Sequence, residues 1–336
     1  MARRRDPIER EADRSVDLYE ITTWEPRSVV DRISLGLYRV GVATVRAVVI
    51  VLALLFLVVQ FVLGGLGAIT EPLVGALVIL SVVPALAIAI YVWYADVTTG
   101  EPLDLLVVTF LLGVLFATFA AVVNTLAFPA FERIPALLGM SLFFFLVVGP
   151  VEETVKLLAI RLHAYRSARF DAVIDGAVYG AAAGLGFATI ENAIFITRGL
   201  ETGLSVAEAI GAAGGTAVVR ALAGPGHVLY SAIAGFYLGL AKFNPENAGP
   251  IVVKGLLIAA LFHAGYNTLV SVVPAVAVAT FDWLTIGLAI FGFIVLYDGV
   301  VAYFLYRKIA AYRSAYRDAG VAPDPDLTPE LDEFDA

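Results

Sequence analysis

Two adjacent glutamates and a lysine interrupt an apolar stretch at residues 149–158, GPVEETVKLL. A charged side chain at the centre of a membrane helix costs roughly 2.5–3.5 kcal/mol on insertion scales. On a helix, Lys156 follows Glu152 and Glu153 by about one turn, so its ammonium can reach either carboxylate. A single ion pair would suffice to pin two helices together. The second carboxylate must be protonated, paired or hydrated, and it therefore indicates chemistry.

The next apolar segment carries a second pair of polar residues behind a stripe of glycines. Gly176, Gly180 and Gly184 recur every four residues, a pattern that lets membrane helices approach one another closely. Glu191 and Asn192 follow two turns later in the same segment. Close approach at the glycines would bring this Glu–Asn pair toward a neighbouring polar helix.

Two of the three histidines also lie in apolar segments. His227 follows a GPG sequence and lies seven residues after Arg220, whereas His263 shares a helix face with Asn267 at the i+4 position. The third, His163, lies in an arginine-rich loop, and we interpret it as a solvated residue. Histidines inside a membrane mark proton relays, metal ligands or catalysis by default.

This combination of residue types suits the hydrolysis of a peptide bond. Hydrolysis needs an activated water, a general base and donors for the developing oxyanion, which glutamate, histidine and asparagine supply. The same groups could bind zinc, because two histidines and a glutamate with a water form a known hydrolytic site, with another glutamate as base. The residue types alone leave both mechanisms open.

The elements that hold these residues must be membrane helices. Of the 336 residues 60% are hydrophobic and only 15% are charged, against about 25% charged in a soluble domain. The mean hydropathy is +0.89. Cysteine is absent, which excludes disulfides, thiolate metal ligands and a cysteine nucleophile. We therefore predict an all-α, polytopic integral membrane helix bundle.

Hydropathy and helix-breaking residues divide the chain into three parts. Residues 1–46 form a charged N-terminal segment, residues 47–306 a transmembrane domain with its catalytic core at 137–275, and residues 307–336 an acidic tail that we expect to be disordered. We predict about eight transmembrane helices, with the sixth interrupted at AGPGH. They lie near residues 47–68, 73–95, 104–128, 137–161, 172–197, 207–241, 251–275 and 284–306.

The basic residues orient these helices. With the N-terminus inside, 18 of the 22 lysines and arginines fall on the cytoplasmic side. The positive-inside rule then places both termini in the cytoplasm of a multi-pass cell-membrane protein. One loop on that side, DVTTGEPLD, has no basic residue. At 1.5 Å per residue, Glu152, His263 and Glu191 lie about 13, 18 and 28 Å from the cytoplasmic ends of their helices.

Four stretches of the sequence resemble the PrsW family of intramembrane proteases. PVEETVKLLAI matches the family's EExxK, DGAVYGAAAGLGFATIENAIF its DGxxYGxxxGLGFAxxEN, RALAGPGHVLYSAIAG its arginine-then-histidine segment, and LFHAGYNTL its HxxxN. They occur in the family's order across residues 150–267. More distantly they resemble the type II CAAX prenyl proteases and bacteriocin-processing proteins of the CPBP superfamily.

The resemblance implies an intramembrane endopeptidase and a role for each matching residue. Glu152 is our choice for the base that activates water, and Lys156 and Arg220 would hold the carboxylates ionised. The implied catalytic residues are Glu152, Glu153, Glu191, His227, His263 and Asn267. The implied supporting residues are Lys156, Arg220, Asn192 and Asp175.

The resemblance leaves the cofactor open between zinc and a metal-free glutamate mechanism. If zinc takes part, the implied ligands are His227, His263 and Glu191. PrsW proteins are usually labelled metalloproteases, while the prenyl-protease relatives look workable without a metal. Those relatives have a histidine at the position of Glu191, so their water-holding histidine cannot be carried over directly, and His227 must replace it.

The expected partners are membrane-anchored protein substrates and the lipid bilayer, with no nucleic acid. Family members are proposed to cut single-pass anti-sigma factors, so a regulatory substrate of that kind is implied. Two other functions remain: a non-catalytic member that binds membrane proteins, and a proton-coupled transporter. Every motif position is filled, which disfavours the first, and no internal repeat supports the second.

Overall fold

The computed structural model describes residues 17, 26–60, 72–98, 100–198 and 206–318, which contain helices and no strand. The chain divides into two units, residues 1–55 and 56–336. The long helices are α2 (Val29–Gln60), α4 (Pro72–Tyr94), α5 (Leu103–Ala127), α8 (Asp175–Arg198), α9 (Val206–Lys242), α10 (Ala248–Thr280) and α11 (Ile286–Asp318). The shorter ones are η2 (Phe128–Ala130), α6 (Ala136–Phe143), η3 (Phe144–Val148), α7 (Gly149–Leu162), η4 (Ala164–Arg166) and η5 (Pro245–Asn247).

Helix α2 begins with a reciprocal cap. The Asp31 carboxylate accepts hydrogen bonds from the backbone N–H groups of Arg27 and Ser28, and the Ser28 hydroxyl accepts one from the Asp31 N–H. These bonds satisfy N–H groups that have no partner within the helix. The beginning of α2 at Val29 therefore follows from its local sequence.

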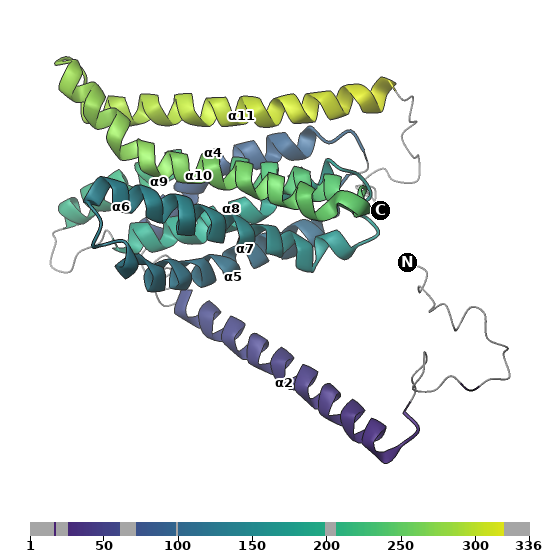
Figure 1. Ribbon diagram of the computed structural model, residues 1–336. Helices are drawn as coiled ribbons and strands as arrows, with labels where there is room; N and C mark the ends of the chain where they lie inside the picture. The colour runs from purple at the N-terminus through teal and green to yellow at the C-terminus, as the bar shows by residue number, and fades with distance from the viewer. Residues whose placement is uncertain (1–16, 18–25, 61–71, 99, 199–205, 319–336) are drawn as a thin grey trace, which may run out of the picture. The chain divides into compact units, whose positions relative to one another are not determined.

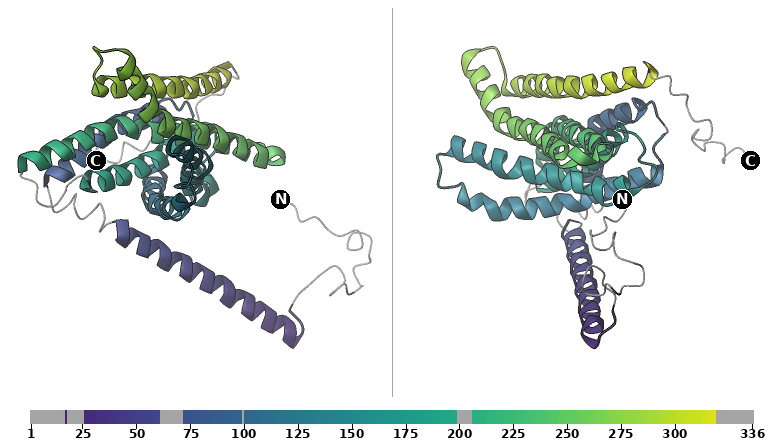
Figure 2. Two further views of the ribbon diagram at one scale, coloured as in Figure 1. Left: turned by 60° about the vertical axis from the view of Figure 1, so that its left-hand side comes forward. Right: turned by 45° about the vertical axis from the view of Figure 1, so that its right-hand side comes forward.

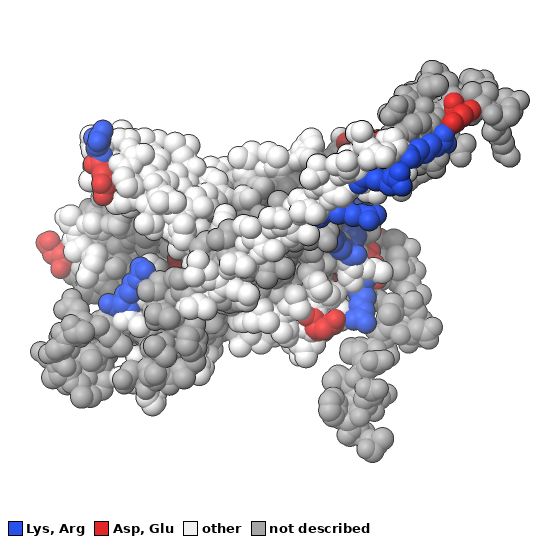
Figure 3. All heavy atoms as spheres, turned by 90° about the horizontal axis from the view of Figure 1, so that it is seen from below, with Lys and Arg blue, Asp and Glu red and all other residues white. Residues whose placement is uncertain are grey.

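The second unit is a membrane helix bundle, as the sequence predicts. Six of the described helical segments are long and apolar enough to span a membrane: Pro72–Tyr94, Leu103–Ala130, Ala136–Arg166, Asp175–Arg198, Pro245–Thr280 and Ile286–Asp318. Large apolar side chains such as Leu80, Leu111, Leu257 and Leu296 are exposed on these helices. Figure 3 shows a broad uncharged surface along these helices. Such a surface suits lipid.

Several predicted boundaries differ from the observed helices or lie outside the described residues. The predicted first span, 47–68, falls partly in α2 and partly at 61–71, outside the described residues. Most of the predicted N-terminal segment and residues 319–336 of the tail also lie outside them. Helix α11 continues to Asp318, so residues 307–318, which we assigned to the tail, are helical.

The predicted interruption of the sixth segment is wrong. Helix α9 runs without a break from Val206 to Lys242, although Pro225 lies inside it. A proline removes one backbone hydrogen bond, and membrane helices tolerate that loss where neighbouring helices or local adjustments satisfy the freed group. Residues 220 and 227 therefore lie on one continuous helix.

The segment that carries the two glutamates contains a turn of π-helix. Residues 144–148 form η3 between α6 and α7, so the helix widens immediately before Gly149. Single π-turns inside helices occur frequently at functional sites. A Cβ at Gly149 would lie 2.8 Å from the Ala260 carbonyl of α10, so this glycine lets α7 approach α10 closely.

Helix α8 occupies the centre of the bundle and packs against α4, α5, α7 and α9. The predicted glycine stripe faces α9, its most extensive neighbour. A Cβ at Gly176, Gly180 or Gly184 would overlap the backbone carbonyls of Gly235, Ser231 and His227 respectively. The stripe therefore brings the two helices into backbone contact, as the spacing predicts. Figures 1 and 2 show α7, α8, α9 and α10 running side by side.

Candidate active site

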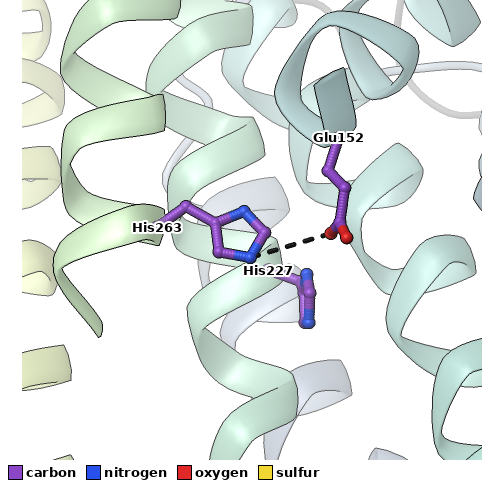
Figure 4. Close-up of side chains that lie close together, drawn as sticks. All are labelled: Glu152, His227 and His263. Carbon is purple, nitrogen blue, oxygen red and sulfur yellow. Dashed lines mark ion pairs between the residues drawn. The ribbon is translucent and has the colours of Figure 1, made fainter. Parts of the chain in front are cut away.

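The polar residues of four helices meet at one cavity of about 330 Å³. Its polar lining consists of Glu152 from α7, Glu191 from α8, Arg220 and His227 from α9, and Tyr230, His263, Tyr266 and Asn267. The apolar lining comes mainly from Phe144, Val148, Phe195, Ala223 and Val270. Figure 4 shows Glu152, His227 and His263 pointing toward one another from their three helices.

Glu152 reaches the cavity with one oxygen bound and one free. The Asn124 side-chain amide of α5 donates a hydrogen bond to Oε1 at 3.0 Å. The other oxygen, Oε2, is buried and accepts no hydrogen bond from the described residues. It lies 3.7 Å from Nε2 of His263, too far for a direct hydrogen bond and suitable for a third atom between them. Asn124 thus fixes the carboxylate while leaving one oxygen for chemistry.

Glu153 lies behind the cavity and holds two other site residues. Its Oε1 accepts hydrogen bonds from the Lys156 ammonium at 2.7 Å and from Nδ1 of His263 at 2.8 Å. The Glu153 and Lys156 side chains are both fully buried. Because a carboxylate only accepts, Nδ1 of His263 carries a proton, and in the neutral ring Nε2 presents its lone pair to Glu152.

The Lys156 ammonium also fixes the tautomer of His227. Lys156 donates to Nδ1 of His227 at 3.0 Å, so the ring proton of neutral His227 resides on Nε2. That nitrogen lies 2.8 Å from Glu191 Oε2 and donates to it. The Phe187 ring stacks on His227 and lies 4.3 Å from the Lys156 ammonium. One polar chain therefore links both histidines through Lys156 and Glu153.

The Arg220 side chain binds two residues in the C-terminal part of α8. Its guanidinium donates to Glu191 Oε2 at 2.6 Å and to the Asn192 side-chain oxygen at 2.9 Å. The Asn192 amide in turn donates to the Ser81 hydroxyl of α4 at 3.0 Å. The Glu191 side chain is 23% exposed, the most among the charged residues of the site. Glu191 therefore stays an ionised acceptor at the more open side of the cavity.

The structure brings together all the sequence-predicted site residues except one. Asn267 lines the cavity, and within the described part of the chain its side chain has no hydrogen-bond partner. Asp175 lies at the opposite end of α8 from Glu191, sixteen residues or about 24 Å away. Its carboxylate accepts hydrogen bonds from the backbone of residues 171 and 172 and does not reach the cavity.

Sequence reasoning missed several residues of the site. Asn124 lies in an apolar stretch of sequence, and nothing in its surroundings identifies Glu152 as the acceptor of its hydrogen bond. Tyr230, which stacks on His263, and Phe187 resemble ordinary core residues in the sequence. Ser81 lies on a helix that carries no motif. The packing of α5 against α7 brings Asn124 to Glu152, and the packing of α4 against α8 brings Ser81 to Asn192.

The geometry fits a metal ion. One ligand atom each of Glu152, His227 and His263 lie within 4.8 Å of one another, and all three residues are buried. His263 presents a lone pair that a carboxylate orients from behind, as metal-binding histidines usually do. The unpartnered Oε2 of Glu152 supplies an oxygen. His227 can bind the ion through Nε2 only if that nitrogen gives up its proton and its hydrogen bond to Glu191. The group thus contains Glu152 in place of the predicted ligand Glu191, which is bound to Arg220.

Comparison with known proteins gives one consistent result. The model of the PrsW family intramembrane metalloprotease matches residues 101–300. Protease PrsW of Bacillus subtilis (strain 168) is 32% identical over 197 residues, covering 57% of this chain and 81% of that protein. Protease PrsW of Geobacillus kaustophilus (strain HTA426) is 31% identical over 203 residues, covering 58% and 79%. No solved structure matches the chain.

Proposed function

The chain belongs to the PrsW family of intramembrane metalloproteases, and from this premise we propose that it cuts membrane-anchored proteins at the Glu152–His263 cavity. One observation carries the assignment of roles. Of the two adjacent glutamates, Glu152 lines the cavity with a free oxygen, whereas Glu153 is fully buried behind it. Glu152 is therefore the carboxylate that meets water, and Glu153 positions its neighbours.

The proposed reaction begins with a water between Glu152 Oε2 and His263 Nε2. Glu152 takes a proton from this water as the water oxygen attacks the carbonyl carbon of the substrate peptide bond. The carbonyl oxygen becomes an oxyanion, and the unengaged Asn267 amide donates a hydrogen bond to it. The carbonyl then re-forms as the C–N bond breaks, and Glu152 gives the proton to the nitrogen of the leaving amine. The apolar part of the lining lowers the local dielectric constant and so strengthens these electrostatic contacts.

The buried ion pair orients the two histidines. Glu153 holds His263 with its Nε2 lone pair toward Glu152, while Lys156 holds His227 with its Nε2 proton toward Glu191. Both rings keep one tautomer as long as this pair is intact. Arg220 maintains the charge of Glu191.

The residues that would hold a zinc ion are Glu152, His227 and His263. When bound, zinc would polarise the substrate carbonyl and lower the pKa of a bound water. Glu191 would then be the cavity carboxylate left to accept the water's proton. Metal analysis of the purified wild type and of the Glu152→Ala variant decides whether Glu152 is a metal ligand or the general base. If the wild type contains stoichiometric zinc and the variant does not, Glu152 is a zinc ligand and Glu191 is the base.

We further propose eight membrane spans with both termini in the cytoplasm of a cell-membrane protein. This topology adds the 47–68 segment and α9 to the six segments already described, and it follows the distribution of basic residues. The substrates would be single-pass proteins, including regulatory ones of the anti-sigma type. Their membrane segment has to enter between helices, and cleavage would release a domain from the membrane.

The test compares protein N-termini in membranes from cells that carry the wild type, Glu152→Gln or Glu246→Gln. The last is a matched control, because Glu246 is an exposed glutamate on η5. We expect new N-termini near transmembrane segments with the wild type and the control, and none with Glu152→Gln. Cleavage by Glu152→Gln at the wild-type rate would refute the role of this residue.

The same cells distinguish the other functions. If no N-terminus depends on the protein under several stresses, and a membrane protein copurifies equally with the wild type and Glu152→Gln, the non-catalytic binding function is correct. Proton flux in proteoliposomes that Glu152→Gln abolishes would instead indicate the transporter.

A further inference from the structure

A second group of carboxylates lies at the opposite end of the bundle from the active site. Asp96 and Glu101 come from the loop between α4 and α5, and Asp175 is the first residue of α8. One oxygen from each lies within 4.8 Å of the others. Glu101 is 6% exposed and Asp175 only 1%. Asp96 and Glu101 of this acidic cluster belong to DVTTGEPLD, the loop that has no basic residue, and the proposed reaction does not use the cluster.

Each aspartate in the acidic cluster has one oxygen bound and the other free. Asp96 Oδ1 accepts from the Thr98 N–H and hydroxyl, at 2.8 and 2.7 Å. Asp175 Oδ2 accepts from the backbone N–H groups of residues 171 and 172, at 2.7 and 2.8 Å. The remaining oxygens, Asp96 Oδ2 and Asp175 Oδ1, are buried and accept no hydrogen bond from the described residues. The local backbone therefore holds both carboxylates in place.

Glu101 and Tyr179 are the unpartnered groups that point to a ligand. Neither carboxylate oxygen of Glu101 has a hydrogen-bond partner in the described residues. The fully buried Tyr179 hydroxyl lies one helical turn after Asp175 and close enough to Glu101 to interact with its carboxylate. No bond of hydrogen-bonding geometry joins the two or reaches another described residue. Buried polar groups are nearly always satisfied, so these oxygens require a partner that no described residue supplies.

The basic residues at this end are engaged elsewhere. The Lys242 ammonium donates to the backbone carbonyls of Tyr165, Ser167 and Phe170, at 2.9, 3.2 and 2.6 Å. Arg169 pairs with the exposed Asp104 at 3.3 Å. Neither Lys242 nor Arg169 forms an ion pair with the acidic cluster.

We propose that the acidic cluster binds one hard divalent cation, Mg²⁺ or Ca²⁺, through Asp96, Glu101 and Asp175, with the Tyr179 hydroxyl beside it. Carboxylate and other oxygen ligands are those that both ions prefer. Oxygens bound at 2.3–2.6 Å to one calcium ion lie at most about 5 Å apart, which the spacing of the cluster satisfies. The cation would tie the α4–α5 loop to the first turn of α8, the helix that carries Glu191 into the active site. This inference does not rest on the proposed function.

The experiment measures thermal unfolding of the purified full-length protein in detergent, first stripped with EDTA and then titrated with Mg²⁺ or Ca²⁺ alone. Each arm is repeated in Glu152→Gln, whose active site is altered while the acidic cluster is intact. We expect a saturable rise of several degrees in the unfolding temperature in both proteins. The ion that acts at the lower concentration is the better ligand.

Isosteric variants show which residues the rise in unfolding temperature depends on. Glu101→Gln and Asp175→Asn should lose the rise, while Asp104→Asn, which removes an exposed carboxylate at the same end, should keep it. Where a variant does not fold, luminescence of Tb³⁺ bound to the wild type, excited through tyrosine and displaced by Ca²⁺, gives an independent readout that Tyr179→Phe should weaken. An unfolding temperature insensitive to both ions, with no Tb³⁺ luminescence above that of Glu101→Gln, would overturn the proposal.

Discussion

Removing either member of the buried Glu153–Lys156 pair should destabilise the protein strongly, whereas removing both should restore much of the loss. Both side chains are fully buried and their charged atoms lie 2.7 Å apart. Removing one partner of a buried ion pair leaves an uncompensated charge and costs about 3–5 kcal/mol. We expect Glu153→Gln and Lys156→Met each to lose stability in this range.

The double variant separates stability from activity. With both charges gone, no unpaired ion remains, so the loss should be smaller than the sum of the single losses by about 3 kcal/mol or more. Activity should stay low, because Nδ1 of His263 and Nδ1 of His227 have both lost the charged partners that fix their tautomers. Stability would recover and cleavage would not.

The assay is a denaturant titration of the four proteins in one detergent, combined with cleavage of a reconstituted substrate. Additive losses, with an interaction energy below about 0.5 kcal/mol, would show that the two charges do not form a pair in the folded protein. Recovery of full cleavage in the double variant would refute the positioning role. The Glu246→Gln control should match the wild type in both assays.

Three further predictions concern the surroundings of the site. Asn124→Leu removes the hydrogen bond to the Glu152 carboxylate and should lower kcat about 10–100-fold with KM nearly unchanged, because hydrogen bonds to charged groups contribute roughly 1.5–3 kcal/mol. It also leaves a buried acceptor unsatisfied, so stability should fall by roughly 1–3 kcal/mol. An equal effect on KM would contradict this role of Asn124. Arg220→Lys keeps the positive charge but loses the guanidinium that binds two α8 side chains at once, so kcat/KM should fall about 10-fold or more. Full activity of this variant would show that the charge alone suffices. Gly184→Val forces α8 away from α9 and should destabilise the folded protein by about 1–3 kcal/mol, measured by thermal unfolding. The control Gly211→Ala, at a glycine with open space around it, should not. Equal effects of the two substitutions would refute the close-packing argument.

The position of each polar residue along its helix does not predict where it lies in the bundle. From sequence, Glu152, His263 and Glu191 have nominal depths that differ by about 15 Å. In the structure, Glu191 and Glu152 line one cavity, and His263 Nε2 lies 3.7 Å from Glu152. Nominal depth assumes equivalent helix starts and no tilt, and neither condition is met by helices whose lengths differ as much as α7 and α10.

The sequence by itself determined that the chain is a helical membrane protein, and it supplied most of the polar residues that meet at the cavity. Composition, helix length and the charges of VEETVK depend only on local sequence, and so does the i, i+3 contact between Glu153 and Lys156. The glycine stripe likewise predicted a close helix contact from its spacing alone.

Only the tertiary structure decided which glutamate faces the cavity and which residues support it. Glu152 and Glu153 differ by one position, so their roles depend on where α5 and α10 pack around α7. The same packing supplies Asn124 to Glu152 and separates Asp175 from the active site, where it joins Glu101 instead. These are contacts between residues tens of positions apart. No local pattern encodes them, because they depend on how the helices tilt and pack against one another.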